Sequence, residues 1–403
     1  MTRIEDLHQS HGKGYELVVK VIGTLTGFKI FEDSSNTHWN FFKKTVTVVC
    51  YVTFAAWSLI SVFDGDDADT ILPALAIVSM GIQYLPKLYL LLFKPKVFAE
   101  LIASIDEVWP STSRLSPEYL EEFNNSLRQS STFFTGVLLF SGMQSILIQS
   151  YGLYKTLWAK FLNPNVKYTF PFEFCYPRET DSLLVFVIIF AIQWSGCVMN
   201  GMGIWDGVGC LFGTIVSSVS RLFIVVQSDL KNIVKARGDD APRSVEETEE
   251  DYNKLKAVVV YHQRVLKIAD ALNSMCTVLV FLDVTFTALA IGIYGFRTTT
   301  MKDSATKLIN FFSGLYVLQI TLIWSWTGQL LADASAEVAI AAHSCLWYTG
   351  DARFRRLIGI IMIRSQSPVY LTSLGFSRVT LQTFVKIMST AYSYISLFSQ
   401  VYE

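Results

Sequence analysis

The sequence predicts an all-α integral membrane protein with seven transmembrane helices, and three observations lead to that prediction. Of the 403 residues, 51% are apolar and only 17% are charged, and the mean hydropathy is +0.38. Ordinary globular chains carry roughly 25% charged residues, so this chain has too few to cover a water-facing surface. The third observation is a series of separate apolar runs, each with the about 20 residues that a helix needs to cross a bilayer.

Seven runs meet this length, and more polar connections separate them. They are residues 46–63, 71–93, 133–157, 183–208, 271–296, 309–331 and 376–401. The fourth run continues as an amphipathic helix to about residue 234, and the fifth begins as one near residue 252. Residues 334–363 are predicted to form a separate helix that is too polar to span, because charged residues cluster in its middle.

The distribution of basic residues predicts the orientation. The N-terminal tail and the even-numbered connections carry roughly three times as many lysines and arginines as the opposite side. Because cytoplasmic connections are the basic ones, we expect the N-terminus in the cytoplasm and, after seven crossings, the C-terminus outside. G-protein-coupled receptors have the opposite orientation, and the chain also lacks their acidic–Arg–aromatic triplet after the third span and their Asn-Pro-x-x-Tyr stretch in the seventh.

With this orientation the chain divides into six parts. They are a cytoplasmic N-terminal segment (1–45), spans one to four with an extracellular aromatic segment at 156–182 (46–208), the cytoplasmic extensions of spans four and five (209–270), spans five and six (271–331), the polar cytoplasmic helix region (332–375) and span seven (376–403). We expect the extended cytoplasmic helices and the polar helix to form an anchor that joins subunits.

Several function classes find little support. The formal net charge of −1 and the lack of a basic stripe argue against nucleic-acid binding. The five histidines show no metal-ligand spacing within a span, and neither a Gly-rich phosphate loop nor a catalytic triad occurs, so no enzyme, metal or other cofactor is expected. A transporter is the stronger rival, with Asp206 and Asp283 as the residues that would serve a buried ion relay, unless both lie at span ends or in the cytoplasmic bundle.

The seventh span carries polar side chains at intervals of four, three, four, three and four residues. They are Gln382, Lys386, Ser389, Ser393, Ser396 and Gln400. These spacings put all of them on one helical face, and polar groups facing lipid are costly. The face therefore meets either another helix in a close seam or the water of a pore, and the spacing leaves both open.

The connection after the third span alternates aromatic residues with a period of two. They are Tyr168, Phe170, Phe172, Phe174 and Tyr176. This period indicates extended chain, and the prolines at 171 and 177 exclude a helix. The aromatic rings form either an interfacial belt on the bilayer or a lid over a pocket, and we interpret the segment as a lid that also serves as a belt.

Two stretches resemble the insect odorant receptor family. The first comprises Trp347-Tyr348, Arg355-Arg356-Leu357-Ile358, Arg364-Ser365-Gln366-Ser367-Pro368, Gly375-Phe376, Thr383-Phe384 and Tyr392-Ser393-Tyr394. The second is Pro171-Phe172-Glu173-Phe174-Cys175-Tyr176-Pro177, which is similar to the family's outer-loop pattern. The length and the inverted topology fit over the whole chain. Gustatory receptors share the architecture and are the alternative, but the Arg-Ser-Gln-x-Pro element fits the odorant branch better.

The resemblance implies a tetrameric, odorant-gated, non-selective cation channel in the plasma membrane of sensory-neuron cilia or dendrites. Its partners would be subunits of the shared odorant co-receptor, membrane lipid and a small volatile organic ligand. The co-receptor carries a long insertion before the fifth span, whereas the segment 228–252 is short here, so the chain resembles a tuning subunit.

The resemblance also suggests site residues. It implies a pore along span seven, in which Val401 matches the hydrophobic gate and Gln400 and Phe398 its neighbours. An odorant pocket is expected in the outer half of the bundle, lined by Met80, Tyr84, Ile148, Phe186, Phe190, Phe312 and Tyr316, although such side chains also serve packing. The predicted subunit anchor includes Trp347, Tyr348, Arg355 and Arg356, with a membrane-surface helix as the alternative.

Overall fold

The computed structural model describes residues 13–28, 37–111, 114–163, 168, 170–172, 174, 182–234 and 244–402. The described chain is an all-helical bundle with one short hairpin. Its helices are α2 (Lys13–Thr26), α3 (Thr37–Asp64), α4 (Ala68–Phe93), α5 (Pro95–Val108), α6 (Pro117–Leu162), α7 (Leu183–Ser195), the π-helix η2 (Gly196–Asp206), α8 (Gly207–Asn232), α9 (Val245–Thr300), α10 (Ser304–Ser344), the 3₁₀-helix η3 (Trp347–Thr349), α11 (Ala352–Ser365) and α12 (Leu381–Tyr402); the strands are β1 (Thr372–Ser373) and β2 (Ser377–Arg378).

The predicted helical spans agree with these elements. Within the described ranges, six helical segments are long and apolar enough to cross a membrane: α3, α4, α6, α7 with η2 and α8, α9, and α10. The seventh, α12, has 22 residues, which is sufficient length, but it carries the polar stripe described above. The chain is thus an all-α membrane protein, and seven crossings are compatible with its helices.

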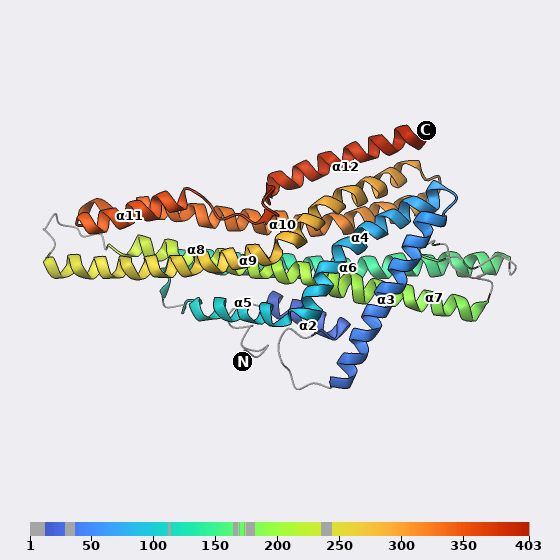
Figure 1. Ribbon diagram of the computed structural model, residues 1–403, viewed down its shortest axis with the longest axis horizontal. Coiled ribbons are helices and arrows are strands. Elements are labelled where there is room, and N and C mark those ends of the chain that lie inside the picture. The colour runs from blue at the N-terminus through green and yellow to red at the C-terminus, as the bar shows by residue number, and fades with distance from the viewer. Residues whose placement is uncertain are drawn as a thin grey trace.

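The long helices extend well beyond a bilayer. α9 has 56 residues, which at 1.5 Å per residue makes it about 80 Å long, whereas the hydrocarbon core is about 30 Å thick. Figure 1 shows α6, α8, α9 and α10 along the longest axis, joined at one end by α3, α4, α7 and α12 and at the other by α5 and α11. The predicted extensions of the fourth and fifth spans are therefore present, as parts of α8 and α9.

Helix α8 is the centre of the molecule, because nearly all of its side chains from Gly207 to Ser228 are buried. Glycines bring its neighbours close. A Cβ at Gly213 would lie 2.6 Å from the Phe134 ring of α6, and one at Gly209 would collide with Ile320 of α10. The tight packing of α8 against α6 and α10 thus depends on residues without a side chain.

Two helices were not predicted from the sequence. α2 buries Val18 and Ile22, and α5 buries Phe98 and Ile102, all in the core around α8. Both are amphipathic helices of 14 residues, too short to span the bilayer, so a search for long apolar runs passes over them.

The prediction of one separate helix over residues 334–363 is wrong. α10 continues without interruption from the sixth span to Ser344, and α11 starts only at Ala352. The break has a local cause: the side chain of Asp351 accepts a hydrogen bond from the Phe354 N–H and caps a new helix. The region predicted to be the subunit anchor therefore consists of the end of α10, η3, α11 and the short hairpin rather than a single helix.

The predicted start of the seventh span at residue 376 is also wrong. Residues 372–378 form the β1–β2 hairpin, whose turn contains Leu374 at φ 48° and Gly375 at φ 76°. Both residues lie in the left-handed region, which no helix can continue through. α12 begins after this turn, at Leu381.

Candidate ligand-binding pocket

A cavity of about 350 Å³ lies within the end of the bundle that holds α3, α4 and α12. Its walls come from α3, α4, α6, η2, α9 and α10 and are overwhelmingly apolar. The aromatic residues that line it are Tyr51, Phe54, Tyr84, Phe172, Trp205, Tyr294 and Tyr316. A cavity of this size and composition suits a small, mostly apolar organic molecule.

The structure places some of the predicted pocket residues in this wall and others elsewhere. Met80, Tyr84, Ile148 and Tyr316 line the cavity, so their part in ligand binding stays a prediction with a geometric basis. The remaining predicted residues do not line it. Phe186 and Phe190 belong to a separate apolar cluster. The backbone carbonyl of Phe312 accepts a hydrogen bond from the side-chain amide of Gln144, which does line the cavity.

The aromatic segment after the third span reaches the cavity through Phe172. The Phe172 ring lines the wall and stacks with the ring of Phe174, which packs edge-on against Phe54. Phe170 turns away from the cavity and packs on Phe186. The predicted lid residue Tyr176 lies outside the described residues.

The lid segment is held by α7 and α6. The Gln193 side-chain amide donates to the Phe172 carbonyl at 3.1 Å, and its Oε1 accepts from the Phe172 N–H at 3.4 Å. A Cβ at Gly152 of α6 would lie 2.9 Å from the Cα of Pro171. Backbone contacts on both sides therefore fix where Phe172 meets the cavity.

Reasoning from the sequence missed several wall residues. Tyr51 and Phe54 come from the first span, Asn200 and Trp205 from η2, and Tyr294 from α9. Asn200 carried a detectable signal, since a polar residue inside an apolar span usually has a function. The first-span aromatics carried none, because nothing in the sequence says which spans are neighbours.

The π-helical segment η2 shapes one wall. A π-helix is rare and frequently occurs at functional sites. Its glycines let other elements approach: a Cβ at Gly201 would lie 2.9 Å from the Tyr316 hydroxyl, and one at Gly203 would lie 2.5 Å from Thr26 of α2. The segment thus brings α10 and α2 against the same stretch of backbone.

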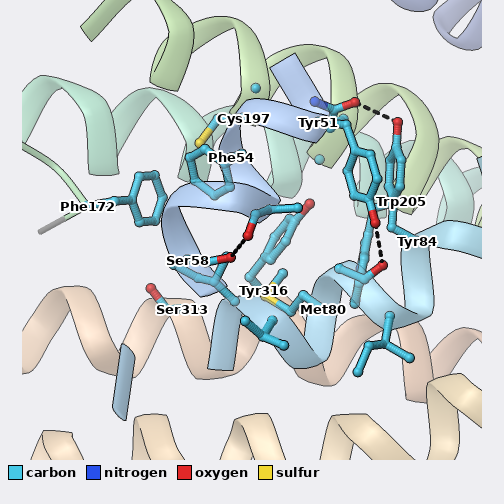
Figure 2. Close-up of a pocket in the computed structure, with 18 of the residues that line it drawn as sticks. Tyr51, Phe54, Ser58, Met80, Tyr84, Phe172, Cys197, Trp205, Ser313 and Tyr316 are labelled. Carbon is cyan, nitrogen blue, oxygen red and sulfur yellow. Dashed lines mark hydrogen bonds between the residues drawn. The ribbon is translucent and has the colours of Figure 1, made fainter. Parts of the chain in front are cut away.

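Two stacked tyrosines form another wall. The rings of Tyr51 and Tyr84 lie 4.3 Å apart between centroids. The Tyr51 hydroxyl donates to the Gly81 carbonyl at 3.1 Å, and the Tyr84 hydroxyl donates to Asn200 Oδ1 at 2.6 Å (Figure 2). Because the protein uses both hydroxyl protons, the tyrosines present mainly their rings to the cavity.

A charged cluster is buried behind this wall. Lys87 Nζ lies 3.0 Å from Asp283 Oδ1, and both side chains are fully buried. The Trp324 indole N–H donates to the other oxygen of Asp283 at 2.7 Å. Lys87 Nζ also lies 4.5 Å from the ring centroid of Trp205. Because Trp205 lines the cavity, the charged cluster packs against the side of the wall that faces away from the cavity.

Asp206 has a polar environment next to the same wall. Its Oδ1 accepts from the Gln319 amide at 2.8 Å, and that amide also donates to the Ser141 hydroxyl at 2.8 Å. Asp206 and Asp283 thus lie inside the helical bundle with side-chain partners from other helices. Within the described ranges, no group of three or more His, Cys, Asp or Glu side chains is placed to hold a metal ion.

Helix α12 packs on α9 with its apolar face. Ile387 and Ala391 are buried, and the polar stripe from Gln382 to Gln400 lies on the opposite, outward side. Two α9 glycines receive α12: a Cβ at Gly292 would lie 2.5 Å from the Tyr394 Cβ, and one at Gly295 would lie 2.5 Å from Ile395. Among the described residues, most of this stripe is exposed and is not covered by another helix.

The predicted gate residues have different surroundings. Val401 is 65% exposed, and Gln400 is exposed on the same outward side. Phe398 instead packs against Phe296 of α9, with ring centroids 5.9 Å apart. Val401 is therefore largely exposed, whereas Phe398 holds α12 to its own chain.

The predicted anchor residues lie at the opposite end of the molecule. Trp347 is partly buried against the main core, and Tyr348, Arg355 and Arg356 are exposed. The ion pairs of this region are made by Arg353, which contacts Glu249 at 2.7 Å. Exposed aromatic and basic side chains leave a surface on which a partner can pack.

Comparisons with known proteins agree with this architecture. A family model described as "7tm Odorant receptor" matches residues 67–392. Odorant receptors 85c and 85b of Drosophila melanogaster are 25% and 24% identical over 347 and 344 residues, with 83% of each chain covered. The structure of the insect olfactory receptor OR5 from Machilis hrabei in complex with eugenol superposes with a TM-score of 0.79 at 12% identity, covering 98% of this chain and 100% of that chain. At that identity the structural likeness shows the fold.

Proposed function

The chain belongs to the 7tm odorant receptor family, a family of odorant-sensing membrane receptors, and we propose that it is the tuning subunit of a ligand-gated, non-selective cation channel. In this proposal it assembles with the shared odorant co-receptor into a tetramer. A small volatile molecule binds in the cavity and opens a pore lined by α12. The N-terminus lies in the cytoplasm, and the assembly resides in the plasma membrane of sensory-neuron cilia or dendrites.

The observation that carries the proposal is the position of α9 between the cavity and α12. Tyr294 of α9 lines the cavity, and Gly292 and Gly295, within one turn of it, receive the side chains of α12. A ligand that displaces Tyr294 therefore acts on the helix segment against which α12 packs. Because α9 contacts both the cavity and α12, the proposed coupling needs no long relay.

The outward polar stripe of α12 supports the pore. Lys386, Ser389 and Ser393 are exposed in the single chain, and the Ser393 hydroxyl donates to the Ser389 carbonyl of its own helix. Exposed polar groups at membrane depth require protein or water beside them. Several copies of α12 around a common axis supply both, with the stripes lining water.

The proposal is tested by recording from cells that express the chain with and without the odorant co-receptor while a panel of volatiles is perfused. We expect odorant-evoked cation current with the co-receptor, including in excised patches that contain no nucleotides. A response that occurs only in cells with intact second-messenger signalling contradicts the channel.

The lid gives a second test. Gly152→Ala puts a Cβ against the backbone of Pro171, so Pro171 must shift. Phe172 is the next residue in the chain, and we expect it to be displaced from the cavity wall together with Pro171. We expect the half-maximal odorant concentration to rise severalfold. Gly136→Ala on the same helix is the matched control, since no atom lies within 4 Å of its added Cβ. Equal responses of the two variants would mean that the lid has no part in binding.

A further inference from the structure

Asn200 lines the cavity, and its amide has a partner for its oxygen but not for its nitrogen. Its Oδ1 accepts from the Tyr84 hydroxyl at 2.6 Å (Figure 2). That bond orients the amide, because the oxygen must face the hydroxyl proton. The amide nitrogen then has two N–H donors, and within the described ranges neither finds an acceptor in the protein.

The other polar groups of the wall either have a hydrogen-bond partner in the protein, are buried beneath other atoms, or are hydroxyls. The Ser58 hydroxyl donates to the Ala55 carbonyl, and the Gln144 amide donates to the Phe312 carbonyl. Gln144 Oε1, the Trp205 indole nitrogen and the Tyr316 hydroxyl also have no hydrogen-bond partner within the described ranges, but these three atoms are fully buried under neighbouring atoms, so a ligand does not reach them. Ser145 and Ser313 also line the cavity, but a hydroxyl both donates and accepts and so selects no single ligand chemistry.

We infer that Asn200 is the specificity-determining residue of the pocket and that it donates a hydrogen bond to a carbonyl oxygen of the ligand. The inference rests on the proposed function and names the ligand class: small volatile aldehydes, ketones and esters, in preference to hydrocarbons of the same shape. A hydrocarbon leaves the two N–H groups without an acceptor in an apolar cavity, and that loss disfavours its binding.

The position of Asn200 in η2 fits this role. In a π-helix the backbone is wider than in an α-helix and redirects the side chains of one turn. The residues on either side of Asn200 in the cavity wall, Cys197 and Gly201, are small, so the amide is reached from the cavity without a bulky neighbour. The ligand's apolar part then contacts the stacked rings of Tyr51 and Tyr84 beside it.

The test uses matched ligand pairs on the chain co-expressed with the co-receptor. Acetophenone is compared with cumene, which replaces the carbonyl oxygen by a methyl group, and octanal with nonane. The measured quantity is the ratio of half-maximal concentrations within a pair, in the wild type and in variants. Dividing the variant ratio by the wild-type ratio removes the different water solubilities of the two ligands.

Asn200→Leu is expected to lower the preference for the carbonyl member by about five- to tenfold, which corresponds to one hydrogen bond. This variant leaves the Tyr84 hydroxyl without its acceptor, which costs stability. The double variant Tyr84→Phe/Asn200→Leu removes both partners of that hydrogen bond, so no unsatisfied hydroxyl remains and we expect it to fold. Its preference is expected to be equally low. Surface labelling of each variant separates loss of preference from loss of protein.

Three outcomes contradict the inference. An unchanged preference in both Asn200 variants overturns it, and so does a preference that is lost in Ser313→Ala but kept in Asn200→Leu. Wild-type potencies that are equal for the two members of each pair, once each is expressed relative to that ligand's water solubility, overturn it while leaving the proposed channel intact. A wild-type chain that reaches the surface with the co-receptor and responds to no volatile counts against the proposed function itself.

Discussion

Asp283→Ala is expected to abolish surface expression of the receptor, and Lys87→Met is expected to do the same. Both side chains are fully buried, and their charged atoms lie 3.0 Å apart. Removing one partner of a buried pair leaves an uncompensated charge and typically costs about 3–5 kcal/mol. Proteins are stable by only about 5–15 kcal/mol, so the loss of either residue consumes a large share of that margin.

The double variant Lys87→Met/Asp283→Leu distinguishes this explanation from a general intolerance of change at these positions. Replacing both charges by apolar groups of similar size is often neutral or stabilising, so we expect surface expression to recover. The Trp324 indole then lacks its acceptor, which leaves a residual loss of about 1 kcal/mol. Surface biotinylation and thermal unfolding of the detergent-solubilised protein measure both effects.

An exposed ion pair serves as the control. Arg353 and Glu249 contact each other at 2.7 Å, but each side chain is about half exposed. Solvent screens such a pair, so Arg353→Met is expected to change expression little. Single variants of Lys87 and Asp283 that fold as well as Arg353→Met would show that the buried pair contributes no stability.

The sequence identifies the transmembrane helices because length and hydropathy are local properties. It does not identify the partner of Lys87, which lies 196 residues away on α9. A lysine in an apolar run indicates that the fold contains an acidic partner for it. Which acidic residue it is depends on helix neighbours and rotations that no local pattern contains.

The pocket shows the same division. Tyr84 and Tyr316, two of the predicted pocket residues, line the cavity, and their part in ligand binding stays a prediction. Phe186 and Phe190, which were also predicted, lie in a separate apolar cluster. Because α7 is apolar on nearly every side, its sequence does not say which face turns inward. The 11 residues of η2 then wind with a different period, which changes the direction of every side chain after Ser195 relative to an α-helix.

The helix break after α10 and the hairpin before α12 were not predicted from the sequence for another reason. The break after α10 and the hairpin before α12 are each set by one or two residues, Asp351 at a helix start and Gly375 at a turn. Such signals are only one or two residues long. Where the residues around them are compatible with a helix, the sequence pattern predicts one continuous helix instead. The apolar side chains of the region, including Phe354 and Ile358, are buried in the chain's own core, whereas Tyr348, Arg355 and Arg356 are exposed.

Val401→Asn is expected to raise the resting current severalfold and to alter the permeability ratio among cations. Val401 is 65% exposed at the end of α12, on the outward side of the helix. In a tetramer that places these helices around one axis, an aliphatic ring at this level resists water because wetting it forms no hydrogen bonds. A polar side chain removes that resistance, and the pore conducts without ligand. The ranking of odorants is expected to stay unchanged, since the cavity is built by other residues.

Phe398→Ala is the informative comparison, because it lies three residues from Val401 but packs against Phe296 of its own chain. Its truncation loosens α12 on α9 without adding a polar group to the pore. We therefore expect a smaller odorant-evoked current with an unchanged permeability ratio, the reverse of the Val401→Asn pattern. In the proposed tetramer, co-receptor subunits would contribute gate residues of their own and dilute the leak, so the permeability ratio is the more sensitive measurement. If Phe398→Ala raises the leak and Val401→Asn leaves both leak and permeability unchanged, the narrowest part of the pore is at Phe398, and α12 must rotate away from α9 in the assembly.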